Sequence, residues 1–423
     1  MEQFIPPKLN PFVLKTVDAL APILMKIMHN IEKIIISDED KAMLKTLKKE
    51  RLIFLSNHPS TAEPPIAYLI ANIIEDRFKY MGSRQVFEWM RGFVGKFIQS
   101  IGAFSVVAGT TDRPSIKMAR SIIAQESGKL AIFPEGEPTS GENENLMPFQ
   151  PGIVQLAYWG LEDARKVDPN ADIVILPAFI KYVIKSPREK ILFRLHKSIA
   201  KIEKKIGINP GKKNLLRRFL TAGRVLLEQA ENEYRIIPKD KKDFNYRIGR
   251  VRHHILDTVA EKLQIQNYDK EAHAITKWRQ VFPIVEMLEV GIMDPKLPNL
   301  SKEDLHWAKN ECIKTYDFSI IKRDNLMEHP TPERFFEWLD RYESIVYKRK
   351  PRMLGGVPSH LPRDAYVFFA KPFKLSEYLP SNKSEKKTMF DSLLARLRSD
   401  IEEQLQKASK LTTPLVTPND IGD

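Results

Sequence analysis

The sequence predicts an α/β protein with a mostly parallel central sheet, covered by helices and interrupted by a helical insertion. Two observations lead to this prediction. In the first part of the chain, short apolar segments typical of buried strands alternate with amphipathic helical segments, as in a parallel sheet. From about residue 190 to 360 the apolar residues recur at helical spacing among many charges, and strand character then returns.

The expected elements follow this division. Strands are expected at about 51–57, 78–82, 102–107, 129–133, 172–183 and 365–373. Helical patterns inside the insertion cover 215–234, 246–263 and 332–347, and a last helix is expected over 387–407. We therefore expect a first domain over 1–190 with an N-terminal amphipathic helix, the helical insertion over 191–360, a return to the first domain over 361–410, and a loose tail over 411–423, rich in Thr and Pro.

His58 lies in a loop after the predicted strand, and Glu63 follows five residues later. Pro64 and Pro65 then open an apolar segment that we interpret as a helix, because proline is favoured at the first helical position. Within a helix this spacing would put His58 and Glu63 on different faces, whereas in a loop they can converge. An imidazole held by a carboxylate is a general base near neutral pH. The alternative is that His58 and Glu63 share a loop and have no catalytic role.

A second apolar strand, at 129–133, ends in the turn Phe133-Pro134-Glu135-Gly136. An open α/β sheet builds its ligand site where the carboxyl ends of its strands carry polar loops. The two loops are therefore expected to face one site. The alternative for Glu135 is an exposed turn residue or a local cap.

Together, Asn57-His58 with Glu63 and the Phe-Pro-Glu-Gly turn at 133–136 resemble the glycerolipid acyltransferases of the lysophosphatidic acid acyltransferase type. That family has Asn-His-x-x-x-x-Asp as its first motif and Phe-Pro-Glu-Gly-Thr/Ser as its third. Segments 101–106, 148–152 and 175–179 are similar to its other motifs in the same order. The resemblance covers about 45–185, resumes near 365, and implies a glycerolipid acyltransferase-like fold.

The sequence departs from the family pattern at three places. The acid of the first motif is Glu63 rather than Asp, one methylene longer. Glu137-Pro138 stands where many members have Thr/Ser-Arg, so the arginine that would pair with a substrate phosphate is missing. Val107-Ala108 stands where the second motif usually has a nearby Arg, and Arg113 follows in a longer loop. Arg113 is therefore the first candidate for a phosphate partner and Lys181 the second, since both residue types bind phosphate. The alternative for Arg113 is a solvated loop charge.

The resemblance implies transfer of a fatty acyl group from a thioester, acyl-CoA or acyl carrier protein, to the hydroxyl of a lysophospholipid such as 1-acylglycerol-3-phosphate. His58 would be the general base and Glu63 would hold it. The substrate-binding residues would be Arg113, Phe133, Pro134, Glu135 and Gly136. No enzyme nucleophile is required, which fits the lone Cys312, and we expect no bound cofactor and no metal site. The alternative is a catalytically weakened lipid-binding or scaffolding relative.

The net charge of +13 and the pI of about 9.4 favour an anionic partner, although many of the charges are expected to be solvated helix faces. Basic clusters lie at 45–51, 212–218 and 348–352. Each basic residue near an anionic membrane contributes on the order of 1 kcal/mol, so these clusters favour a membrane surface. The charge would also attract nucleic acid, but no nucleic-acid-binding motif supports a specific site.

Membrane association is expected to be peripheral, at the cytoplasmic face. The N-terminus lacks the pattern of a signal peptide, and no apolar run reaches the roughly 18 residues of a membrane span. Segment 12–28 is an amphipathic helix that suits either the protein core or a bilayer surface. Segment 87–98 carries aromatics at helical spacing, which suits core packing, an acyl-chain tunnel or an interfacial patch.

Overall fold

The computed structural model describes residues 4–107, 112–139, 144, 146–292, 297–347, 355–380 and 383–421. The basic cluster at 348–352 lies outside them. The chain forms two compact units. The first comprises Met1–Ser140, Glu144–Lys185 and Leu361–Leu411, and the second comprises Gly141–Asn143, Ser186–His360 and Thr412–Asp423.

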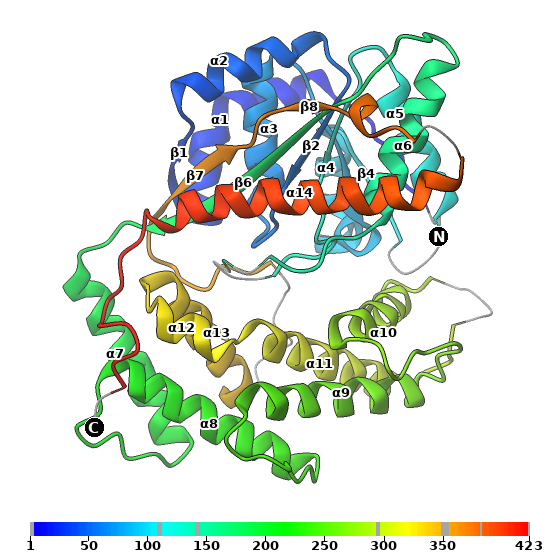
Figure 1. Ribbon diagram of the computed structural model, residues 1–423. Coiled ribbons are helices and arrows are strands. Elements are labelled where there is room, and N and C mark those ends of the chain that lie inside the picture. The colour runs from blue at the N-terminus through cyan, green and yellow to red at the C-terminus, as the bar shows by residue number, and fades with distance from the viewer. Residues whose placement is uncertain are drawn as a thin grey trace. The chain divides into compact units, whose positions relative to one another are not determined.

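A mostly parallel sheet forms the centre of the first unit (Figure 1). Within the described residues it has eight strands in the order β1-β7-β6-β2-β5-β3-β4, with β8 beside β6. Only the pairings of β6 with β7 and β8 are antiparallel. The strands are β1 (Ile31–Ile35), β2 (Leu52–Ser56), β3 (Lys79–Ser83), β4 (Ala103–Val106), β5 (Lys129–Ile132), β6 (Val174–Ile184), β7 (Arg363–Phe369) and β8 (Phe373–Lys374). The predicted fold class is confirmed.

Strand β1 is the strand at the sheet edge that the sequence analysis did not predict. Its five residues, Ile-Glu-Lys-Ile-Ile, carry two adjacent charges and leave two exposed positions, so neither a buried run nor a regular alternation marks it. It lies at the edge of the sheet and pairs in parallel with β7, more than 300 residues later in the chain. The long separation explains why local pattern did not reveal it.

Helices cover both faces of the sheet. On one face lie α2 (Asp38–Thr46) and α3 (Glu63–Ile74), and on the other lie α5 (Arg113–Ala124), α6 (Gly152–Arg165) and α14 (Lys386–Ser409). The remaining helical elements of this unit are α1 (Pro11–His29), η1 (Leu47–Lys49), η2 (Arg84–Gly92), α4 (Phe93–Ser100), η3 (Leu375–Tyr378) and η4 (Lys383–Glu385). Figure 1 shows α14 crossing the sheet as one long helix.

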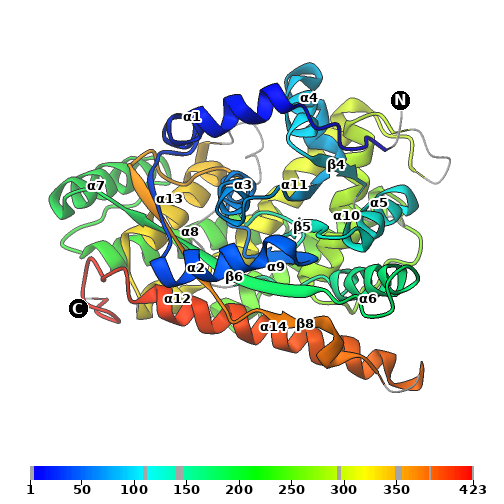
Figure 2. The ribbon, with the colours of Figure 1, turned by 90° about the horizontal axis from the view of Figure 1, so that it is seen from above.

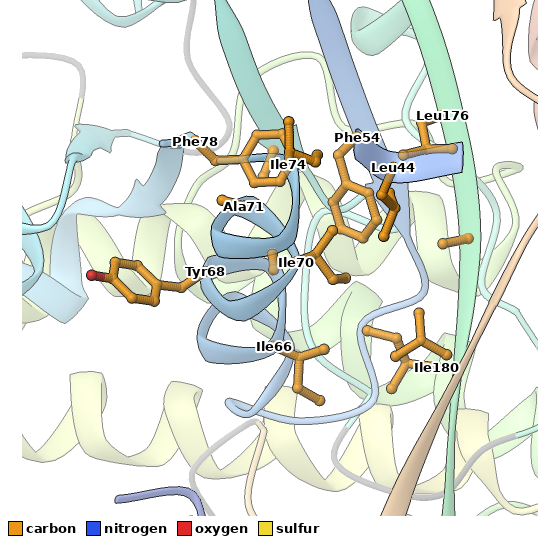
Figure 3. Packing of buried hydrophobic residues seen from close by; sticks show 14 of the residues in the cluster. Leu44, Phe54, Ile66, Tyr68, Ile70, Ala71, Ile74, Phe78, Leu176 and Ile180 are labelled. Carbon is orange, nitrogen blue, oxygen red and sulfur yellow. The ribbon is translucent and has the colours of Figure 1, made fainter. Parts of the chain in front are cut away.

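The two-residue period of β2 divides its side chains between two cores. Leu52 and Phe54 join the core on the α3 face, whereas Ile53 and Leu55 join the core under α5, α6 and α14. Figure 3 shows Phe54 beside Ile70 of α3 in the first of these cores. All five residues of β2 are buried, in agreement with its apolar run over residues 52–55.

Segment 87–98 is not one regular helix. η2 is broken near its end, where Met90 and Arg91 adopt positive φ values of 49° and 59°. α4 then packs closely against the backbone of Phe87. A Cβ atom at Gly95 would lie 2.2 Å from the Phe87 carbonyl oxygen, so only glycine fits at this position. The glycine permits a close helix contact that the spacing of the aromatic residues does not indicate.

The second unit is helical (Figure 1). Its helices are α7 (Arg188–Lys205), α8 (Leu215–Glu233), α9 (Phe244–Lys262), α10 (Ala274–Glu289), α11 (Lys302–Ile320), α12 (Arg323–Glu328) and α13 (Pro332–Tyr347). The chain end also packs in this unit: the N–H of Leu415 donates to Pro330 O at 2.8 Å, and that of Asn419 to Met327 O at 2.8 Å. The Thr and Pro content alone did not indicate these contacts.

Candidate active site

His58 and Glu63 meet at the carboxyl end of β2. The strand ends at Ser56, His58 lies in the following loop, and Glu63 is the first residue of α3 rather than a loop residue. His58 Nδ1 lies 2.9 Å from Glu63 Oε2. The Glu63 side chain is completely buried, and that of His58 is 14% exposed. The convergence expected from the five-residue spacing is therefore present, with the acid at the start of the helix.

Both oxygens of Glu63 receive hydrogen bonds. Ser60 donates twice, from its backbone N–H to Oε2 at 2.8 Å and from its hydroxyl to Oε1 at 2.8 Å. The Tyr182 hydroxyl also donates to Oε1. Because these contacts come from donors, they suit a carboxylate and hold it in one orientation. Glu63 is thus an anchored acceptor for the imidazole.

The contact with Glu63 determines which nitrogen of His58 can accept a proton. Since the carboxylate accepts, Nδ1 carries the hydrogen, and Nε2 keeps its lone pair. Nε2 has no hydrogen-bond partner among the described residues. The imidazole also stacks on Phe133, with 4.4 Å between ring centroids and an interplanar angle of 22°. The ring is fixed on one side while Nε2 is left for an incoming group.

Asn57 joins β2 to β6 directly beside the imidazole. Its amide donates to Ile180 O at 3.0 Å, and its side-chain oxygen accepts from Ile180 N–H at 2.7 Å. This pair of bonds replaces the strand ladder where β2 turns away, so it sets the direction in which His58 leaves the sheet. Sequence analysis quoted Asn57 within the motif but gave it no role.

Glu135 holds the backbone of the His58 loop. Its carboxylate accepts from the backbone N–H of His58 at 2.8 Å and of Met147 at 2.7 Å. On the other side, Thr139 N–H donates to His58 O at 2.9 Å. Glu135 is only 1% exposed, so it is not a surface turn residue. Burial raises the pKa of its carboxyl, and the two N–H donors oppose that shift.

The turn after β5 depends on glycine. Gly136 N–H donates to Phe133 O at 3.0 Å, and Gln150 N–H donates to Pro134 O at 2.7 Å. Gly136 has a φ of +83°, which residues with a Cβ atom rarely adopt. A Cβ at Gly136 would also lie 2.9 Å from Gln150 Nε2. The turn brings Phe133 under the imidazole and Glu135 against its backbone.

Tyr182 and Ser60 complete the site and were missed from sequence. Tyr182 lies on β6, and burial together with the adjacent Glu63 charge raises its pKa well above the usual range, so it remains a donor. The Arg363 guanidinium covers the Tyr182 ring at 4.0 Å from the centroid. The available signal was the two-residue period of β6, which puts Tyr182 on the same face as Ile180.

The two candidate cations lie in different settings. Arg113 is an exposed residue at the start of α5, and no hydrogen bond joins its side chain to the residues around His58. Lys181 is buried and forms an ion pair with Glu144. Neither is joined to the imidazole and its carboxylate. Among the described residues there is no group of three side chains that could hold a metal ion.

A comparison with protein families agrees with this geometry. Residues 28–181 match the family model described as Acyltransferase. The match includes His58, Glu63 and the turn at 133–136. A search of curated proteins found no matching relative. Residues 28–181 are therefore a domain of the acyltransferase family.

Proposed function

We propose that this protein is an O-acyltransferase that moves a fatty acyl group from a thioester to a lysophospholipid hydroxyl. The donor would be acyl-CoA or acyl carrier protein, and 1-acylglycerol-3-phosphate is the proposed acceptor. One observation carries the proposal: Nδ1 of His58 is bound to a buried, anchored Glu63, while Nε2 has no partner among the described residues. That arrangement is a general base ready for a hydroxyl group.

The proposed reaction needs no covalent enzyme intermediate. The acceptor oxygen attacks the thioester carbonyl carbon while His58 Nε2 takes the hydroxyl proton. Glu63 stabilises the imidazolium that forms. The C–S bond then breaks, and the proton passes from Nε2 to the departing thiolate, so that ester and thiol are the products. Cys312 does not take part, because burial raises the pKa of its thiol far above neutrality.

The acceptor pocket would be shaped by Phe133, Pro134, Glu135 and Gly136. Phe133 supports the imidazole from below, and Glu135 fixes the loop that carries it. Arg113 is proposed as the phosphate partner because its exposed guanidinium makes no hydrogen bond or ion pair with the described residues. Lys181 is a weaker proposal, since its ammonium group is already paired with Glu144.

A membrane surface is the proposed place of action, and two helical segments of the first unit support it. α1 exposes apolar side chains between lysines, and the η2–α4 segment exposes others beside Arg91 and Lys96. The chain just before α1 is hydrogen-bonded to the end of α4, since Asn10 N–H donates to Ser100 O at 2.9 Å. Figure 2 shows α1 and α4 along one margin of the unit. Exposed apolar groups flanked by cations suit an anionic bilayer. The apolar residues are Phe12, Leu20, Ile23, Ile27 and Met28 of α1, and Met90, Phe93 and Phe97.

None of the helices within the described parts of the chain combines the length and the apolar character needed to cross a bilayer.

The direct test is acyl transfer by wild type and by His58→Ala. Labelled palmitoyl-CoA and palmitoyl acyl carrier protein are each offered with a panel of lysophospholipids that includes 1-acylglycerol-3-phosphate. We expect His58→Ala to lower the rate about 10²–10⁴-fold, the usual contribution of a general base. His306→Ala, at an exposed position of α11, is the matched control and should leave the rate unchanged. If wild type transfers no acyl group from either donor, the chain is instead a lipid-binding relative.

A further inference from the structure

The second unit contains a cavity that the proposed reaction does not use. It has a volume of about 470 Å³ and lies among α8, the start of α9, the end of α11, α12 and α13. Sites for small molecules in proteins have volumes of roughly 300–1,000 Å³, so this cavity can hold a small ligand. All of its lining residues belong to the helical unit. The inference therefore concerns this unit alone.

The walls of the cavity are mainly apolar. They come from separate helices, so the cavity is formed by the tertiary packing of the unit and not by one groove along a helix. The side chains that form this wall include Leu220, Phe244, Ile248, Phe318, Trp338 and Ile345. Water inside an apolar cavity finds few hydrogen-bond partners, so such a cavity stays dry and binds apolar ligands instead. The wall therefore suits a hydrocarbon chain.

The polar part of the lining is basic. Lys213, Arg217, Arg224 and Arg323 line the cavity, and none of the described lining residues is an acid. Arg224 and Arg323 are 54% and 39% exposed, and their nearest acids, Glu228 and Asp324, lie 3.9 and 3.4 Å away. These cations therefore lie toward solvent and are only loosely paired on the helix surface.

Arg217 is the most informative of the four cations. It is half-buried on the first turn of α8, and its guanidinium has no ion pair or hydrogen bond with the described residues. Its backbone is held, because its N–H donates to Asn214 Oδ1 at 2.9 Å. A guanidinium that is positioned beside an apolar cavity, and has no partner in the described parts of the chain, is suited to a carboxylate or a phosphate.

We infer that this cavity binds a single-chain lipid whose head group is a carboxylate or a phosphate. The hydrocarbon chain occupies the apolar interior, and the anionic head lies against Arg217 near Arg224 and Arg323. This assigns the helical insertion a lipid-binding site of its own. The inference does not depend on acyl transfer by the first unit.

The binding of three lipids to the full chain tests the inference by titration calorimetry below the concentration at which the lipids form micelles. Palmitate supplies a carboxylate head, 1-palmitoylglycerol-3-phosphate a phosphate head, and 1-palmitoylglycerol a neutral head on the same chain. We expect at least one anionic lipid to bind more tightly than the neutral one. Which of the two binds identifies the head group.

Two variants locate the binding. Arg217→Gln keeps the size of the side chain and removes its charge, and it should weaken the anionic lipid about 10-fold or more, since hydrogen bonds to charged groups are the strong ones. Leu220→Trp fills the cavity and should remove the binding event. Arg250→Gln, on an exposed position of α9 outside the cavity, loses the same charge and should bind as wild type does.

The inference is overturned if neither anionic lipid binds, or if the neutral lipid binds as tightly as both. It is also overturned if Arg217→Gln and Leu220→Trp, shown to be folded by circular dichroism, bind like wild type. A site in the first unit would give that last result, because neither substitution lies there.

Discussion

Shortening Glu63 to Asp should impair the enzyme even though Asp is the residue that the family resemblance leads one to expect. In this chain the partners of the acid are arranged for the longer side chain. Glu63 Oε2 lies 2.9 Å from His58 Nδ1, and Oε1 lies 2.8 Å from the Ser60 hydroxyl. Tyr182 approaches the same Oε1 from β6.

The expected loss follows from these distances. Glu63→Asp draws the carboxylate back by up to about 1.5 Å, the length of one carbon–carbon bond. The distance to His58 Nδ1 then exceeds the roughly 3.2 Å limit of a good hydrogen bond. A hydrogen bond to a charged group contributes about 1.5–3 kcal/mol. Losing it in the transition state lowers kcat/KM by about 10- to 100-fold.

The assay compares kcat/KM for acyl transfer by wild type, Glu63→Asp and Glu63→Gln, after thermal unfolding has shown that each variant is folded. Glu63→Gln keeps the length but loses one acceptor oxygen and the charge, so its activity should fall at least as far as that of Glu63→Asp. If Glu63→Asp retains activity within about twofold of wild type, the length of the acidic side chain does not matter for its hydrogen bonds, and the reasoning is refuted.

Three further results are expected. Tyr182→Phe removes one donor to Glu63 while keeping the ring, and it should lower kcat by about 10-fold without raising KM; an unchanged kcat in steady-state kinetics would show that Ser60 alone suffices. Gly136→Ala should destabilise the protein by about 1–2 kcal/mol because of its φ of +83°, as measured by urea unfolding, and a wild-type midpoint would contradict this. Because burial raises the pKa of the Cys312 thiol, iodoacetamide at neutral pH should neither label Cys312 nor inhibit the folded enzyme, whereas labelling should be complete in denaturant; rapid labelling of the native protein would disprove the buried, protonated state.

Much of the fold could be predicted because its signals are local. The buried run of β2 and the helical periods of α8, α9 and α13 are each contained in fewer than 20 consecutive residues. The pairing of His58 with Glu63 is local as well, since five residues separate them. For the same reason the turn at 133–136 could be recognised as a second loop of the site. Periodicity and motif spacing report contacts of this kind.

The contacts that orient the Glu63 carboxylate, in contrast, come from residues distant in the sequence. Tyr182 reaches Glu63 across 119 residues, and Asn57 binds Ile180 across 123. These contacts exist because β6 lies beside β2 in the sheet. The sequence of a strand does not indicate which other strand will pair with it. The edge strand β1 and the cavity in the helical unit are equally products of packing between distant segments. Local sequence therefore specified the elements and the pair of His58 and Glu63, whereas strand order and helix packing supplied the partners that hold the pair in place.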